Sequence, residues 1–335
     1  MMDEEQIAAI RALPKVELHL HLEGAAPPDF IRRLAREKSV RVDHIFRPDG
    51  SYDYGDFVHF LTVYEAATSV LKSPEDYARL TRAVLEESAA SGVIYTESFL
   101  SPDFCGGGDL GAWREYLAAI REAADEAERD LGITMRGIVT CIRHFGPDRA
   151  KRAALCAAET AGDWLTGFGM AGDENRGHQK DFAWSFDMAR EAELNLTTHA
   201  GEWRGAREVR EAVRDLRVAR IGHGVRAIED PEVVDILVEK GIVLEVCPGS
   251  NVTLGVYPRI AAHPVDKLRR KGVKLTISTD DPPFFHTSMA DEYEALAHAF
   301  GWTEEVFEDI AVTAAEAAFC DEATRAGIRK RLERP

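Results

Sequence analysis

Basic residues are scarce relative to acidic residues in this sequence of 335 amino acids. Forty-one Lys and Arg stand against 58 Asp and Glu, which gives a formal net charge of −17 at pH 7. Such a surface repels the phosphates of nucleic acids and of anionic lipids unless a local basic cluster offsets it, and the sequence contains no such cluster. We therefore expect neither a nucleic acid nor a membrane surface as a partner.

Cysteines and apolar stretches are sparse as well. The five cysteines are an odd number, and none forms a CxxC pair, which argues against a disulfide framework and a cysteine-based zinc finger. No stretch approaches the roughly 18 consecutive apolar residues of a membrane span. Residues 1–15 start acidic and lack the basic region and apolar run of a signal peptide. These features predict a soluble cytoplasmic protein.

The overall composition is that of a globular chain. Hydrophobic residues make up 45% of the sequence and charged residues 30%. The length suits either two average domains or one large α/β barrel. Because we find no internal repeat, low-complexity tract or flexible linker, we expect a single domain over residues 1–335.

Eight short runs of apolar and β-branched residues end in polar residues or glycine, as strands do. Helix-like stretches lie between them, and two begin with a capping residue followed by proline, at Ser73-Pro74 and Asp230-Pro231. Alternating strands and helices predict parallel pairing, and eight strands predict a (β/α)8 TIM barrel of the α/β class. An open doubly wound sheet is the alternative. The expected strands are residues 16–22, 93–100, 133–142, 165–171, 194–200, 220–223, 242–247 and 273–279.

One connection is longer than a crossover needs. Residues 23–92 separate the first two strands, and they contain Phe57, Phe60, Leu61 and Tyr64 at helical spacing. The loops that follow barrel strands line the active-site face, so this insertion predicts a helical lid over the mouth. The alternative is a set of packed helices without a part in chemistry.

The first strand carries an unusual polar face. Its even-numbered residues are valine or leucine, whereas its odd-numbered residues are Glu17, His19, His21 and Glu23. Since side chains alternate along a strand, we expect the odd-numbered residues to point into the barrel. Two imidazoles and two carboxylates are costly to bury without a partner, and a divalent cation would serve as one. An exposed edge strand is the alternative.

Histidines and aspartates also end three other strands. His199 follows the fifth strand, His223 the sixth, and Asp280 and Asp281 the eighth. In a parallel barrel these ends meet the end of the first strand at one mouth. Nitrogen and oxygen donors without thiolate suit Zn²⁺ best, ahead of Fe²⁺ or Mn²⁺, and an open coordination position is typical of a catalytic site.

A further acidic residue lies beside this cluster. Glu202 is three residues past His199, in the expected loop, where it would serve as a general acid or base next to a metal-bound water. A glutamate stabilised at a helix N-terminus is the alternative. The fourth strand has no lysine, the residue that bridges two metals in binuclear barrels, so a single metal is favoured.

Six motifs together resemble those of the adenosine deaminases, the adenosine, adenine and AMP deaminase branch of the metal-dependent amidohydrolase superfamily. They occur in the family's order and span most of the chain. The motifs are PKVELHLHLEGA (14–25), GMAGDE (169–174), THAGE (198–202), RIGHG (220–224), EVCPGSN (245–251) and STDDP (278–282).

The resemblance implies a metal site and a set of catalytic residues. One Zn²⁺ per chain would be held by His19, His21, His199 and Asp280. The catalytic residues would be Glu202, His223 and Asp280. Glu202 would protonate N1 of a purine while zinc-activated water attacks C6, and His223 would lie beside that water.

The resemblance also implies the substrate contacts. These are His21, Glu23, Gly172 and Asp281, with Asp281 at N7 and the Gly172 backbone at N3. Adenosine-specific members usually carry aspartate at the ribose, where this chain has Glu23, as free-adenine deaminases do. We expect deamination of adenosine to inosine, with adenine or another 6-aminopurine nucleoside as the alternative.

Other hypotheses remain at this stage. A metal-dependent amide or ester hydrolase would use the same ligands, and a non-catalytic nucleoside-binding protein would keep the pocket. Cys247 is expected to pack rather than to act as a nucleophile. His286 lies close to STDDP in the sequence, which is compatible with a contact to the substrate and equally with no role in the site.

Overall fold

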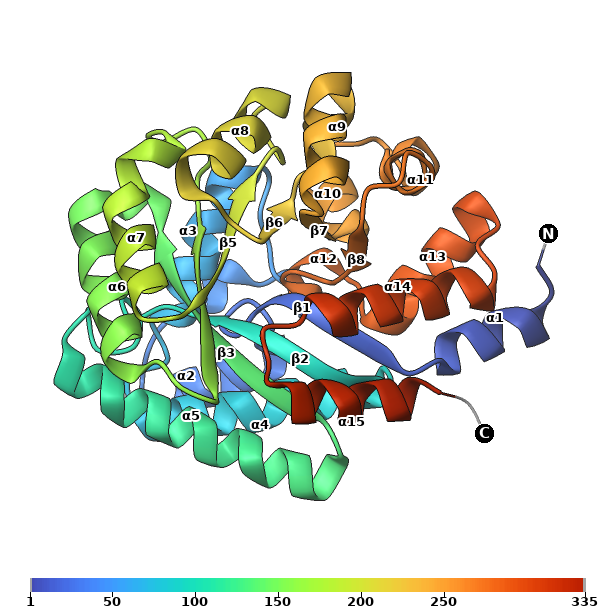
Figure 1. The fold of residues 1–335 in the computed structure, drawn as a ribbon. Helices are drawn as coiled ribbons and strands as arrows, with labels where there is room; N and C mark the ends of the chain where they lie inside the picture. Colours follow the sequence, from blue (N-terminus) through green and yellow to red (C-terminus); the bar gives the residue numbers. More distant parts are fainter. Residues whose placement is uncertain (1, 334–335) are drawn as a thin grey trace.

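Eight parallel strands pair in chain order from β1 to β8, and the last strand returns to the first (Figure 1). The computed structural model describes residues 2–333. The backbone closes where the His21 amide donates to the Asp280 carbonyl at 3.0 Å and the Asp280 amide to the His19 carbonyl at 3.1 Å. The predicted TIM barrel is confirmed. The strands are β1 (Lys15–His21), β2 (Val93–Leu100), β3 (Thr134–Ile142), β4 (Leu165–Ala171), β5 (Asn195–Ala200), β6 (Arg220–His223), β7 (Val243–Val246) and β8 (Leu275–Ile277).

Helices surround the strands and begin where the sequence signals predict. Ser73 and Asp76 form a capping box at the start of α4, and Asp230 caps α9 ahead of Pro231. The helices are α1 (Glu4–Ala12), α2 (Pro28–Glu37), α3 (Phe57–Thr68), α4 (Pro74–Ala90), α5 (Leu110–Leu131), α6 (Pro147–Thr160), α7 (Ala183–Glu191), α8 (Ala206–Glu211), α9 (Pro231–Lys240), α10 (Pro248–Thr253), α11 (Val265–Arg270), α12 (Pro282–Phe285), α13 (Met289–Phe300), α14 (Glu304–Ala317) and α15 (Glu322–Leu332).

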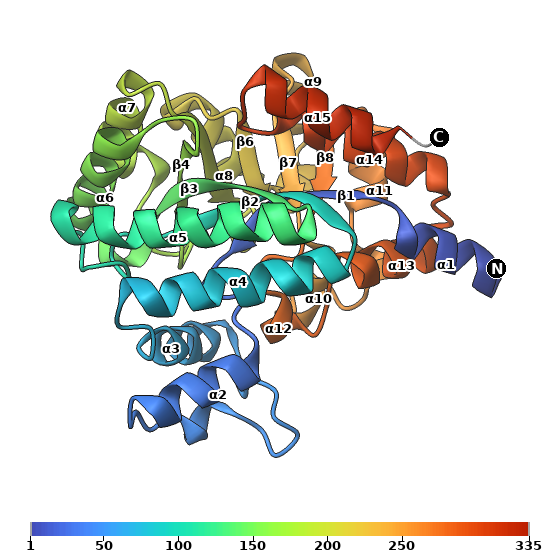
Figure 2. The ribbon, with the colours of Figure 1, turned by 90° about the horizontal axis from the view of Figure 1, so that it is seen from below.

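The long connection after β1 divides into two parts. Figure 2 shows α2 and α3 standing off from the barrel, while α4 runs alongside α5. The buried side of α4, with Tyr77, Leu80 and Val84, belongs to the main core. This helix is therefore the crossover helix that joins β1 to β2. The part of residues 23–92 that stands off from the ring ends before α4, so it is shorter than the range expected for the lid.

A β-bulge interrupts the alternation of β1. Between Glu17 and Leu20, three steps along β1 match two steps along β2. Leu18 packs in a cluster with residues of α14 and α15, whereas Glu17 lines a cleft beside α4 and accepts hydrogen bonds from Thr279. The prediction that Glu17 shares the face of His19 is wrong, because the extra residue of the bulge shifts the alternation.

The sequence argues against a disulfide framework and against membrane-spanning helices, and the structure describes both the cysteines and the helices. The five cysteines are free thiols, and four of them are buried. Between residues 2 and 333, no helix has both the length and the apolar character needed to cross a bilayer.

Candidate metal and active site

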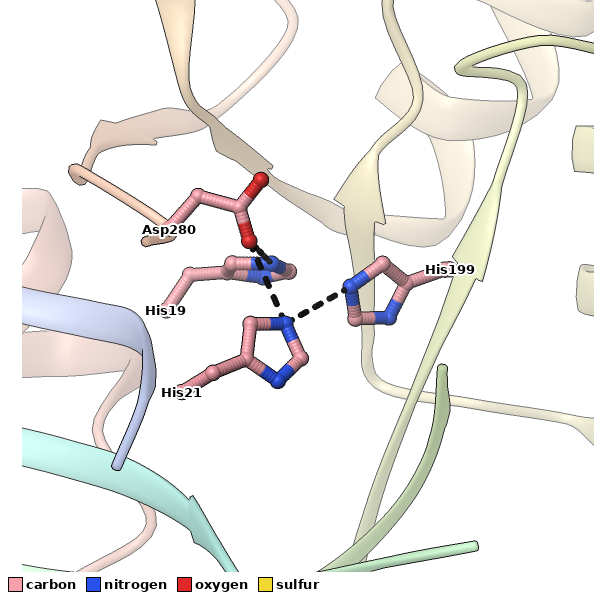
Figure 3. Close-up of side chains that lie close together, drawn as sticks. All are labelled: His19, His21, His199 and Asp280. Atoms are coloured by element: carbon pink, nitrogen blue, oxygen red, sulfur yellow. Dashed lines mark hydrogen bonds and ion pairs between the residues drawn. The ribbon is translucent and has the colours of Figure 1, made fainter. Parts of the chain in front are cut away.

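Four side chains from three distant parts of the chain converge at the carboxyl ends of the strands (Figure 3). His19 and His21 come from β1, His199 from β5, and Asp280 from the segment that follows β8. One ligand atom from each lies within 4.8 Å of the others. Asp280 Oδ1 lies 3.3 Å from His19 Nε2 and 3.2 Å from His21 Nε2. The Nε2 atoms of His21 and His199 are 3.2 Å apart.

The donor set fits a divalent cation. Burial lowers the pKa of His21, and it lowers the pKa of His199 still further, so both imidazoles are neutral and keep a lone pair for a ligand. Burial opposes ionisation of Asp280, but the adjacent imidazoles of His19 and His21 outweigh it and hold the pKa of that carboxyl well below its usual value. His19 Nε2 is buried without a hydrogen-bond partner among the described residues. Three nitrogens and one carboxylate oxygen that face one point are a donor set that could hold a single divalent cation, and mononuclear zinc sites use donors of this kind.

Outer partners fix the two histidines that come from different strands. Glu245 Oε2 lies 2.7 Å from His19 Nδ1, and both side chains are fully buried. The Met170 carbonyl lies 2.8 Å from His199 Nδ1. Each contact places the proton on Nδ1 and aims Nε2 at the other ligands, as the outer partners of metal-bound histidines do.

A buried arginine anchors the glutamate behind His19. Arg220 Nε donates to Glu245 Oε1 at 2.6 Å, and Arg220 Nη2 lies 2.6 Å from Glu97 Oε2. The guanidinium stacks 3.5 Å above the ring centroid of Phe319. Two buried carboxylates are thus paired with one buried cation, which keeps Glu245 ionised: its pKa lies below the usual value although burial works to raise it.

The EVCPGSN segment supplies two further contacts that the sequence analysis did not assign. Ser250 Oγ donates to Asp280 Oδ2 at 2.7 Å, and Asn251 Nδ2 donates to Glu202 Oε1 at 3.4 Å. Glu245 begins the same segment. The motif itself was the available signal, but its polar residues act through contacts across the barrel that spacing does not show.

Glu202 and His223 face each other beside the cluster of His19, His21, His199 and Asp280. His223 Nε2 lies 3.6 Å from Glu202 Oε2 and 3.8 Å from Asp280 Oδ2, and it has no hydrogen-bond partner among the described residues. His223 and Asp280 both have φ in the left-handed region, at 61° and 68°. Strained backbone of this kind persists where the surroundings hold it in place, often at active sites.

Burial shifts the pKa values of Glu202 and His223 in opposite directions. Burial raises the pKa of Glu202 well above the usual value, and the nearby carboxylates of Asp280 and Glu174 raise it further. Burial lowers the pKa of His223 to about 3. The raised pKa favours the protonated acid form of Glu202. His223 is a neutral imidazole whose Nδ1 accepts from Asn251 Nδ2 at 3.2 Å, so its proton is on Nε2, on the side of Glu202 and Asp280.

A cavity opens from this cluster towards α3. His21, His199, Glu202, His223, Asp280 and Asp281 form its inner end. Gly172 lies in the wall with φ of 102°, and a Cβ there would come within 2.6 Å of His144 Nδ1. Burial raises the pKa of Asp281 well above the usual value, with the charge of Asp280 adding to the effect. Its Oδ1 has no hydrogen-bond partner among the described residues.

Three residues singled out in the sequence lie off the cavity. Glu23 is buried and accepts from Tyr77 Oη at 3.0 Å and Tyr64 Oη at 3.4 Å, and burial raises its pKa to about 7. Cys247 is buried, with its thiol pKa raised well above the usual value by burial, and it is not among the lining residues. His286 is exposed and lies in an outer groove beside Pro282 and Arg32, so proximity to STDDP does not bring it to the site.

Comparison with known proteins identifies relatives over nearly the whole chain. A family model described as adenosine deaminase matches residues 14–335. A protein of Rhizobium rhizogenes named adenine deaminase is 49% identical over 320 residues, covering 96% of this chain and 99% of that protein. One of Chelativorans sp. with the same name is 46% identical over 321 residues, covering 96% and 98%.

Two solved structures share the fold. The adenine deaminase of Arthrobacter aurescens superimposes with a TM-score of 0.87 at 29% identity, covering 96% of this chain and 98% of that one. An amidohydrolase of Burkholderia ambifaria with bound zinc superimposes with a TM-score of 0.88 at 28% identity, covering 99% and 93%.

Proposed function

The chain belongs to the adenosine deaminase family, and we propose that within it the enzyme hydrolyses free adenine to hypoxanthine and ammonia. It is an aminohydrolase that acts on the amino group of a purine. The choice of adenine rests on one observation: relatives 46–49% identical over nearly their full length are named adenine deaminase. This favours the alternative over the expectation of adenosine. It gives no support to an amide or ester hydrolase or to a non-catalytic binding protein.

The position of Glu23 agrees with a free base as substrate. A residue that recognises ribose has to offer its polar group to the cavity. Here the Glu23 carboxylate is held by the hydroxyls of Tyr64 and Tyr77, and of these three residues only Tyr64 lines the cavity. A sugar would have to displace Tyr64 to reach this carboxylate, at the cost of a buried hydrogen bond.

We infer that the metal is a single zinc ion held by His19, His21, His199 and Asp280. When bound there, the ion lowers the pKa of a coordinated water towards neutrality and so supplies a nucleophile. The side chains behind the ligands hold them in orientation. Glu245 keeps Nε2 of His19 turned to the site, and Ser250 holds the second oxygen of Asp280.

The remaining residues handle the protons. Glu202 gives its proton to N1 of the ring as the new C6–O bond forms, so that no isolated negative charge develops on the purine. Asp280, ionised and 3.8 Å from His223 Nε2, takes up the proton of the attacking water, and the Nε2–H of His223 orients that water. Return of that proton to the amino group lets the C6–N bond break with ammonia as the leaving group. The proton of the C6 hydroxyl passes to the Glu202 carboxylate, which leaves the 6-oxo purine and restores the acid. Asp281 and the Gly172 amide orient the ring through N7 and N3.

An ultraviolet assay with adenine and adenosine side by side, before and after treatment with a chelator, tests this proposal. We expect chelator-sensitive turnover of adenine, with kcat/KM at least 100-fold above that for adenosine, on the order of the discrimination that a few lost polar contacts produce. A preference for adenosine would overturn the assignment of the substrate. Failure to deaminate either compound, with zinc bound, would overturn the proposed reaction.

A further inference from the structure

The half of the cavity away from the metal ligands offers few polar groups. Among the described lining residues of this half, only Tyr64, Glu65 and His144 carry polar side chains. The Tyr64 hydroxyl is already engaged by Glu23. The other side chains of this half are apolar: Phe57, Phe60, Leu61, Phe104, Ile142, Ala171 and Leu254.

Glu65 and His144 form a pair that joins α3 to the wall of the cavity. His144 Nδ1 accepts a hydrogen bond from the backbone amide of Asp173 at 3.1 Å. The proton of the neutral imidazole is therefore on Nε2, which lies 3.3 Å from Glu65 Oε1 and donates to it. Both ring nitrogens of His144 are thus committed, and the carboxylate of Glu65 is the hydrogen-bonding group left to meet a ligand.

The pair lies on the side of the cavity where the far edge of a purine would be. The ring of His144 packs against the backbone of Gly172, so closely that a Cβ added at Gly172 would lie 2.6 Å from His144 Nδ1. Carbon C6 has to lie at the inner end, beside Glu202 and the metal ligands. Because N9 is across the fused ring from C6, it points away from that end and into the half of the cavity that Glu65 lines.

We propose that Glu65, oriented by His144, accepts a hydrogen bond from the N–H of the five-membered ring of free adenine and so discriminates the base from N9-substituted purines. This inference rests on the proposed function. Ionised carboxylates only accept hydrogen bonds, and a free base has an N–H on this ring. A nucleoside has a carbon substituent on N9, which leaves the carboxylate desolvated and unpaired.

Solvent limits the size of the effect. The Glu65 side chain is 48% exposed and that of His144 20%, so water can partly replace a lost contact. We expect Glu65 to account for about a 10- to 100-fold preference in kcat/KM, below the 10⁴-fold or more of fully buried sites. The contact is made in the ground state and the transition state alike, so its loss raises KM and leaves kcat unchanged.

The test compares adenine with 9-methyladenine, which blocks N9 without adding a sugar. We expect Glu65→Met, which removes the acceptor at similar length, to lower kcat/KM for adenine at least tenfold through KM. The same change should not lower kcat/KM for 9-methyladenine, because it removes the carboxylate that this compound leaves unpaired. Glu65→Gln retains an acceptor oxygen and should keep part of the preference. His144→Phe should lose part of it, because Glu65 is no longer oriented. If wild-type turnover of 9-methyladenine is too slow to follow, its inhibition constant against adenine supplies the comparison.

Thr62→Met, an exposed change on the same helix and outside the cavity, is the matched control. Equal losses for both substrates in Glu65→Met, or no loss for either, would overturn the role of Glu65 while leaving adenine deamination intact. A wild-type enzyme that does not deaminate adenine would overturn the proposed function, and this inference with it. Should Glu65→Met not fold, the test uses Glu65→Gln and the ratio of its kcat/KM for adenine to that for 9-methyladenine. A ratio equal to that of the wild type would contradict the proposal.

Discussion

Glu174 holds the backbone on both sides of Glu202. Its carboxylate accepts hydrogen bonds from the amide of Gly201 at 2.5 Å and from the amide of Trp203 at 2.6 Å. The Arg204 amide donates to the same carboxylate at 3.0 Å. A glutamate from the loop after β4 thereby fixes the loop after β5, and it places the proposed acid without touching the substrate.

Replacing Glu174 should impair the reaction without disturbing the metal. In Glu174→Gln, an NH₂ group faces backbone amides that can only donate, so the loop shifts and Glu202 moves away from the ring. We expect kcat for adenine to fall about 10- to 100-fold, since small displacements of catalytic groups cost this much. Steady-state kinetics and zinc content by atomic emission measure both effects. Glu191→Gln, an exposed change on α7, is the control, and a kcat within twofold of wild type would contradict the anchoring role.

Glu202 should be needed as an acid. Glu202→Gln keeps the shape and the contact with Asn251 but cannot supply a proton to N1. We expect kcat/KM to fall by about 10²- to 10⁴-fold, the usual contribution of a general acid, with zinc content unchanged. Near-full activity of this variant would rule out the assigned role.

The pH profile should carry the signature of the same group. Burial raises the pKa of Glu202 well above that of an ordinary glutamate, and the reactive form is the protonated one. Activity should therefore be present below the raised pKa and decline as the pH rises through it. The measurement is kcat/KM against pH between 5 and 10. In Glu202→Gln the residual kcat/KM should no longer decline at high pH. If the decline persists unchanged, the titration of another group causes it, and the prediction is wrong.

Removing the metal should lower both activity and stability. The four ligands are buried, or nearly so, and their lone pairs face one another at 3.2–3.3 Å, which is unfavourable without a cation between them. We expect dialysis against a chelator to abolish turnover and to lower Tm, with zinc restoring both. A ligand at 1,000 times its Kd stabilises by about 4 kcal/mol. His199→Ala is the control, since its Tm should not respond to the chelator. If the chelator does not lower the Tm of the wild type either, the proposal that these four residues form a metal site would be contradicted.

A buried glutamate away from the reaction should make stability depend on pH. Glu292 accepts from the Gly249 amide at 3.0 Å and from Thr287 Oγ1 at 2.8 Å, and burial raises its pKa from 4.5 to about 7. The folded state thus holds a proton that the unfolded state has lost. The stability from this group is complete below pH 4.5 and is lost as the pH rises to about 7.

Glu292→Gln mimics the protonated form and should remove that dependence. We expect the variant to gain roughly 1–3 kcal/mol relative to wild type between pH 5 and pH 8. Urea unfolding at the two pH values measures the difference. Glu305→Gln, an exposed change on α14, is the control and should show no gain. A constant difference between Glu292→Gln and wild type would mean that Glu292 is already ionised at pH 5.

Local pattern was sufficient for the barrel and for most of the residues that meet at its mouth. All eight strands were placed within a few residues of the observed ones, because each is a short apolar run that ends in a polar residue. Parallel strands bring their carboxyl ends together, so the sequence alone predicts that His199, His223 and Asp280 lie near the histidines of β1.

Packing across the barrel decided what the pattern missed. The bulge in β1 turns Glu17 away from the site, and Tyr64 and Tyr77 hold Glu23 off the cavity. His19 is oriented by Glu245, which is 226 residues further along the chain. Periodicity describes one strand and its two faces, and it predicts which residues share an end. Which buried group completes a hydrogen bond depends on the closure of β8 onto β1 and on the bulge, and these are set by the packing of the whole chain.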